Sequence, residues 1–161
     1  MAADENHGER LDREHEQLFH ELRSILPGAE VLFAFLLTIA FTERFKSLTD
    51  TQRNVYFATF LIAGAALVLL LSPTAFHRIR FRQGDKEAML RLANVEMIAA
   101  MMLMSMAITG VVFLICDLLF STTLALLVCA PLLAFISTIW WLVPLRRKFN
   151  NLDSNSEETP Q

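Results

Sequence analysis

Long uncharged apolar runs dominate the pattern of this chain. Residues 54–76 and 97–116 form runs of 23 and 20 residues without a charged side chain. A helix needs about 20 such residues to cross the hydrocarbon core of a bilayer, and a packed soluble domain has no use for several of them. The pattern predicts an all-α, polytopic membrane protein with four transmembrane helices, over about residues 29–48, 54–76, 95–116 and 122–144.

The first apolar run is too short to cross by itself. Only 12 residues, 31–42, separate Glu30 from Glu43, which is about 18 Å of helix. Either the segment is re-entrant, or Glu43 and the basic residues after it lie at the interface with extended side chains. The run contains no glycine or proline, which favours a full span over residues 29–48.

An amphipathic segment precedes this first run. Residues 9–26 place six apolar side chains on one helical stripe and charged side chains elsewhere. Pro27 and Gly28 follow directly, which predicts that the helix ends there. We expect an interfacial helix that lies along the membrane surface and turns into the bilayer at this point. Docking of the stripe onto a partner or a second copy is the alternative.

Local signals mark the remaining helices. Thr49 and Gln52 have the spacing of a capping box that opens the second helix. Small residues at 63–66 predict close approach of another backbone, and Pro73 and Pro131 predict bends in the second and fourth helices.

The chain is predicted to have three regions: a cytoplasmic segment 1–28, a transmembrane domain 29–146 and a disordered cytoplasmic tail 147–161.

Charge distribution predicts the orientation. The chain is 54% hydrophobic and 19% charged, with a net charge of −3. Of its 14 Lys and Arg residues, 11 belong to the amino-terminal segment, the second connector and the tail, which four spans place on one face. By the positive-inside rule, both termini are cytoplasmic. No cleavable signal peptide is visible, and no basic stripe indicates a nucleic-acid partner.

Three segments carry a family resemblance. They read ELRSILPGAEVLFAFLLTIAF, RNVYFATF and SPTAFHRIRFRQGDKEAMLRLAN, within residues 21–120. The chain resembles a family of small four-span bacterial membrane proteins that is catalogued only as a domain of unknown function. The resemblance implies the same four-span fold and a bacterial inner (cytoplasmic) membrane location. Some members of that family carry an automatic sodium:proton antiporter label.

Glu30 and Glu96 are the strongest candidates for functional residues. Carboxylates at the edge of a span are costly unless they face protein, water or a cation. Neither residue has a basic side chain three or four positions away on its own helix. If the two approached each other, they could share a proton or a cation. The alternative is that each pairs with an arginine of the second connector.

Two more acidic residues, Glu43 and Asp117, fall on the predicted outer face. They could begin an ion pathway there. The alternative is that they only mark helix ends, with Glu43 near Arg44 or Lys46.

The second connector alternates basic and apolar residues beside the cytoplasmic interface. Its basic residues include Arg78, Arg80, Arg82 and Lys86. Such a pattern suits anionic lipid headgroups, at about 1 kcal/mol for each basic residue. The same charges also enforce topology, and both roles are compatible.

These patterns define two function hypotheses. The chain contains no complete catalytic, cofactor or metal motif, so we expect neither an enzyme nor a bound cofactor or metal. The first hypothesis is a structural or interaction module that faces anionic lipid. The alternative is a small antiporter of Na⁺ or K⁺ and H⁺ that uses Glu30 and Glu96. Because four helices enclose little space, exchange would require a homo-oligomer to supply the pathway.

Overall fold

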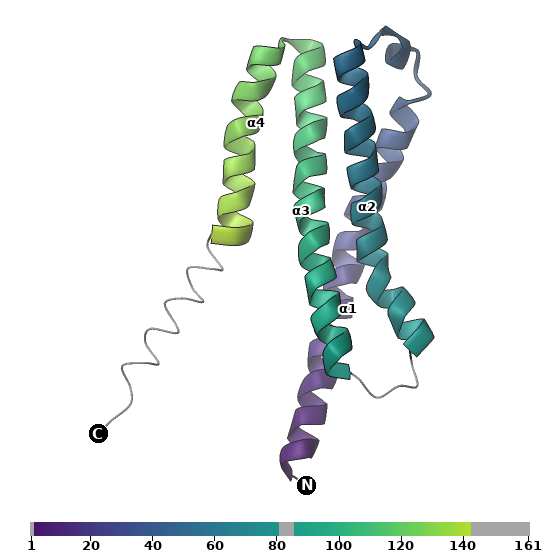
Figure 1. Ribbon diagram of the computed structural model, residues 1–161, viewed down its shortest axis with the longest axis vertical. Helices are drawn as coiled ribbons and strands as arrows, with labels where there is room; N and C mark the ends of the chain where they lie inside the picture. Colours follow the sequence, from purple (N-terminus) through teal and green to yellow (C-terminus); the bar gives the residue numbers. More distant parts are fainter. Residues whose placement is uncertain (1, 81–85, 143–161) are drawn as a thin grey trace, which may run out of the picture. The chain divides into compact units, whose positions relative to one another are not determined.

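The computed structural model describes residues 2–80 and 86–142, and this part of the chain is all-helical (Figure 1). Its elements are α1 (Ala2–Ile39), the 3₁₀ turn η1 (Glu43–Ser47), α2 (Asp50–Arg80), α3 (Lys86–Leu119), α4 (Thr122–Ser137) and the π-helical turn η2 (Thr138–Leu142).

Four of the described helices are long and apolar enough to cross a membrane: His20–Ile39, Asp50–Ala75, Arg91–Leu119 and Thr122–Trp140. The predicted polytopic, four-helix fold is therefore confirmed. The chain divides into two compact units, residues 1–110 and 111–161.

The first helix differs from the prediction at Pro27. The sequence predicts an interfacial helix that ends at Pro27 and Gly28, but α1 runs without interruption through both residues. Proline removes only one helical hydrogen bond, the one to the carbonyl of Arg23. Leu22 and Ala29, on either side of the proline, are both buried against neighbouring helices. This packing keeps the helix continuous, so the predicted turn into the bilayer at Pro27 is absent.

The apolar stretch of the first helix also differs from the prediction. By length and composition, the part of α1 that could cross a membrane is His20–Ile39 rather than residues 29–48, and residues 43–47 form the 3₁₀ turn η1. The short apolar run that begins at residue 31 is therefore extended by the preceding residues of α1. Residues 2–19 continue the same helix for about 27 Å beyond the span.

Buried positions in residues 1–110 recur with a seven-residue period. On α1 they are Leu22, Ala29 and Leu36; on α2 they are Tyr56, Thr59, Ala63, Ala66, Leu70 and Pro73; and on α3 they include Ala93, Met97, Ala100 and Ala107. Alternating steps of three and four residues are the signature of left-handed, coiled-coil-like helix packing. The three helices therefore pack along narrow seams rather than around a wide core.

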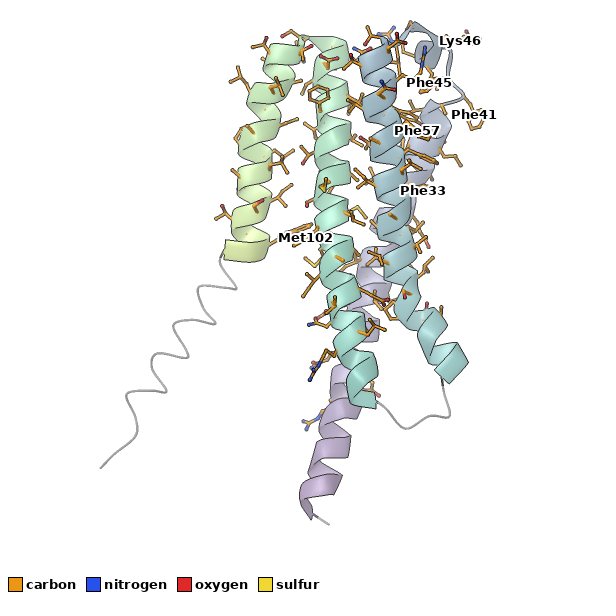
Figure 2. The ribbon with its side chains drawn as sticks, viewed as in Figure 1. Phe33, Phe41, Phe45, Lys46, Phe57 and Met102 are labelled. Atoms are coloured by element: carbon orange, nitrogen blue, oxygen red, sulfur yellow. The ribbon has the colours of Figure 1, made fainter. Side chains whose placement is uncertain are left out.

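Small residues let these helices approach closely, as the sequence predicts for residues 63–66. Ala63 and Ala66 are buried, and a Cβ added at Gly64 would lie 3.2 Å from Cε2 of Phe33 on α1. Phe33 is labelled in Figure 2. Without a large hydrophobic driving force between helices in lipid, such close contact is the main source of association.

Outward-facing positions carry large apolar side chains instead. Phe41, Phe57 and Met102, all labelled in Figure 2, are exposed. This is the expected surface of a protein that contacts lipid.

An aromatic cluster joins α1 to α2 where α1 ends. Phe33 stacks on Phe60 at a centroid distance of 5.0 Å, and Phe45 meets Tyr56 edge-on at 5.0 Å. The Tyr56 hydroxyl donates a hydrogen bond to the carbonyl oxygen of Leu36. The last carbonyls of a helix have few helical donors, so Tyr56 satisfies one of them.

The start of α2 confirms the predicted capping box. The Thr49 backbone N–H donates to Oε1 of Gln52 at 3.1 Å, and the Gln52 N–H donates to Oγ1 of Thr49 at 3.3 Å. At the other end, α2 continues through Pro73, and Figure 1 shows its final turns leaving the line of the preceding ones. This agrees with the predicted bend.

In residues 111–161, Ser121 caps α4. Its Oγ accepts a hydrogen bond from the backbone N–H of Leu124 at 3.3 Å. The helix continues through Pro131 to Ser137, where its winding changes to the π-helical turn.

Candidate functional site

Glu96 is held by a hydroxyl from the neighbouring helix. The Ser72 hydroxyl of α2 donates a hydrogen bond of 2.8 Å to Oε1 of Glu96 on α3, and both side chains are half-buried. Glu96 lies about 7.5 Å inside the span that begins at Arg91. A hydrogen bond to a carboxylate is one of the stronger polar contacts, and it holds this group in the interface between α2 and α3.

Glu30 lies near the middle of the apolar stretch of α1. The sequence predicts it at the edge of a span, but within His20–Ile39, which is long enough to cross a membrane, it lies about 15 Å of helix from one end and about 14 Å from the other. Its side chain is exposed, and it makes no hydrogen bond or ion pair with the described residues. An exposed carboxylate near the middle of a membrane span is costly.

The structure does not join the two carboxylates. Glu30 and Glu96 lie on helices that enter from the same side, and their depths differ by about 7 Å. Glu96 is engaged by Ser72, whereas Glu30 faces outward from α1. A proton or cation shared directly between them therefore has no support in this arrangement.

Glu43 and Asp117, which the sequence predicts on the outer face, each have a local partner. Glu43 forms an ion pair with Lys46 at 2.9 Å, with its side chain 89% exposed. Asp117 accepts a hydrogen bond of 2.5 Å from the Thr122 hydroxyl across the connector before α4. These contacts agree with the alternative that both residues only mark helix ends.

The basic connector is only partly described. Arg78 and Arg80 belong to the last turns of α2, and Lys86 is the first residue of α3. Arg82 and the side chains of the other three lie outside the described residues. The predicted contacts of these side chains with headgroups or with Glu30 and Glu96 therefore stay predictions.

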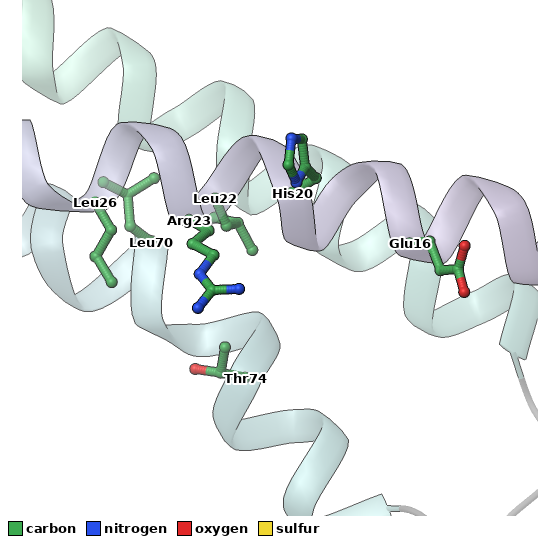
Figure 3. A pocket seen from close by; sticks show the side chains of 7 residues that line it. All are labelled: Glu16, His20, Leu22, Arg23, Leu26, Leu70 and Thr74. Carbon is green, nitrogen blue, oxygen red and sulfur yellow. The ribbon is translucent and has the colours of Figure 1, made fainter.

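A groove of about 550 Å³ lies between α1 and the end of α2. Figure 3 shows its lining, which combines three polar or charged groups of α1 with an apolar floor and one hydroxyl. The lining residues are Glu16, His20, Leu22, Arg23, Leu26, Leu70 and Thr74.

Sequence reasoning did not identify Ser72 or the groove. Ser72 and Glu96 are equally far from Gly84 in the connector, and residues equidistant from the turn of a helical hairpin face each other. That symmetry is a usable signal for Ser72. The groove depends on the continuity of α1 through Pro27, which local sequence rules do not predict.

Among the described residues, no group of three or more His, Cys, Asp or Glu side chains could hold a metal ion.

A comparison with known proteins adds one finding. The model of a family of unknown function, DUF6328, matches residues 4–144. No curated protein and no solved structure matches the chain. Because this match covers most of its length, the chain belongs to the family of unknown function DUF6328.

Proposed function

We propose that this multi-pass protein is a structural or interaction module without enzymatic activity, whose basic connector faces anionic lipid headgroups. The observation that carries the proposal is the depth of the connector residues. The apolar span of α2 ends at Ala75, but its helix continues to Arg80. Arg78 and Arg80 therefore lie about 4.5 and 7.5 Å beyond the span.

The same depth recurs on α3. Lys86 begins this helix about 7.5 Å before the span that starts at Arg91. The headgroup region extends roughly 5–7.5 Å beyond the hydrocarbon on each side. The positions of these helix ends thus support the proposal that the basic residues lie at the level of the lipid phosphates. In the orientation that we propose, both termini and this connector are cytoplasmic, in a bacterial inner membrane with anionic lipid.

Neutralising the connector is expected to weaken the preference for anionic lipid. We would compare the native protein with Arg78→Gln/Arg80→Gln/Arg82→Gln in nanodiscs of increasing phosphatidylglycerol content in phosphatidylcholine. The melting temperature of the native protein should rise with phosphatidylglycerol. The variant should lose most of this rise, because each removed charge takes away roughly 1 kcal/mol of attraction to anionic lipid. Salt should reduce the rise, because it screens exposed charges.

The first connector provides a matched control. Lys46 pairs with Glu43, and Arg53 pairs with Asp50 at 3.4 Å. Because two of the three basic residues already have acidic partners, Arg44→Gln/Lys46→Gln/Arg53→Gln should change the lipid preference much less. Equal losses in the two triple variants would contradict a specific role for the second connector.

Cation/proton exchange is a second candidate, supported by the depth of Glu30. Transporters place their coupling sites near the bilayer midplane, and the position of Glu30 near the middle of the apolar stretch His20–Ile39 supports this candidate. Glu96, held by Ser72, would provide a second carboxylate closer to the edge. The pathway would run between copies of the chain in a homo-oligomer and carry Na⁺ or K⁺ against H⁺.

Flux measurements test this candidate. Liposomes that contain the protein should acidify or alkalinise in response to a Na⁺ or K⁺ gradient. Glu30→Gln should reduce the flux to the level of empty liposomes, and Ser72→Ala should reduce it less, because the Glu96 carboxylate remains. Glu43→Gln, at an exposed ion pair, serves as the control. Folded native protein that produces no flux would exclude exchange of these ions.

A further inference from the structure

The groove between α1 and α2 combines a charge and an apolar floor at the membrane boundary. Arg23 lies about 4.5 Å inside the first span, and Thr74 lies one residue before the end of the second span. Leu22 and Leu70 are buried, and Leu26 is half-buried. A groove at this level opens to the region where lipid headgroups meet acyl chains.

Arg23 has no counter-charge among the described residues. It makes no ion pair or hydrogen bond with them, although its side chain is exposed at the edge of the hydrocarbon. Figure 3 shows the guanidinium directed toward Thr74 on α2, with Leu26 and Leu70 adjacent. A guanidinium in this position is costly unless an anion satisfies it, and phosphate suits its planar set of donors.

The polar groups follow an order along α1. Leu26 and Leu70 of the apolar floor lie deepest, Arg23 comes next with Leu22 beside it, and His20 and Glu16 lie about 4.5 and 10.5 Å farther out than Arg23. A phospholipid whose headgroup ends in an amine has the same order of groups: acyl chain, phosphate, ammonium. Glu16, which also makes no ion pair with the described residues, would face the ammonium.

We propose that this groove is a binding site for phosphatidylethanolamine. The phosphate pairs with Arg23, one acyl chain covers Leu22, Leu26 and Leu70, and the ammonium lies toward Glu16. This site is separate from the basic connector and does not depend on its proposed role. It selects a headgroup with an amine, whereas the connector favours net negative charge.

The test measures lipid-dependent melting of the purified protein in detergent. Phosphatidylethanolamine should raise the melting temperature of the native protein more than phosphatidylcholine or phosphatidylglycerol does. Arg23→Gln should abolish the rise with phosphatidylethanolamine and phosphatidylcholine and leave only the response to phosphatidylglycerol that the connector provides. Arg13→Gln, exposed on the same helix outside the groove, should retain the rise with all three lipids. Glu16→Gln should remove the preference for phosphatidylethanolamine but keep a response to phosphate-containing lipid.

Two further measurements distinguish this site from a site for the free headgroup and from the basic connector. Phosphoethanolamine in water should give no comparable rise, because it lacks the acyl chain that fills the apolar floor. The triple arginine variant of the connector should keep the full response to phosphatidylethanolamine. Equal melting curves for Arg23→Gln and Arg13→Gln, or an equal response to all three lipids in the native protein, would overturn the proposal.

Discussion

Replacing Leu36 by alanine is expected to lower the free energy of unfolding by about 2–4 kcal/mol, the usual cost of truncating a fully buried leucine. Leu36 is 2% exposed and is the largest fully buried side chain of the described residues. In a membrane, the loss is mainly dispersion contact with neighbouring helices, because lipid is as apolar as leucine. The bond from Tyr56 survives, since it goes to the Leu36 backbone.

The neighbouring residue is a matched control. Leu37 has the same side chain on the same helix but is 46% exposed. Leu37→Ala should change stability by no more than about 0.5 kcal/mol, as expected for a surface substitution. Both variants would be compared by equilibrium unfolding in mixed micelles. Similar losses for the two leucines would contradict the assigned seam between the helices.

Replacing Gly110 by alanine should destabilise the contact between α2 and α3. A Cβ at Gly110 would lie within 2.2 Å of Oγ1 and 3.0 Å of Cγ2 of Thr59, which is buried on α2. The Thr59 hydroxyl is bonded to the Val55 carbonyl of its own helix, so its side chain cannot rotate away freely. Such overpacking costs about 1–3 kcal/mol.

Removing the colliding atoms should restore most of this loss. Thr59→Ala leaves only its Cβ, 3.2 Å from the new methyl group, a distance that a small helix shift relieves. The double variant Thr59→Ala/Gly110→Ala should therefore be more stable than Gly110→Ala alone. A double-mutant cycle measures this coupling directly. Additive effects of the two substitutions would contradict the close approach of these helices.

Regular patterns allowed much of the fold to be predicted. Apolar length predicts four spans, the spacing of Thr49 and Gln52 predicts a capping box, and small residues at 63–66 predict close packing. Each signal is local, because helix periodicity and capping depend on residues within a turn or two of one another. The structure confirms all three.

The errors arise where packing overrides a local rule. Pro27 predicts a helix end, but burial of residues on both sides keeps α1 continuous. As a result, the stretch of α1 that is long and apolar enough to cross a membrane is His20–Ile39, and Glu30 lies near its middle rather than at its edge. The continuity of α1 also creates the groove beside Arg23. The candidate sites were therefore less predictable than the fold, since their depth depends on a contact between helices.

The central claim is that the second connector faces anionic headgroups, and its most direct test is the lipid dependence of stability. The melting temperature would be measured against phosphatidylglycerol content for the native protein and for Arg78→Gln/Arg80→Gln/Arg82→Gln. We predict a rise for the native protein that the variant largely loses, whereas the triple variant of the first connector retains it. The claim would be contradicted if the native protein and the second-connector variant gained equally from anionic lipid.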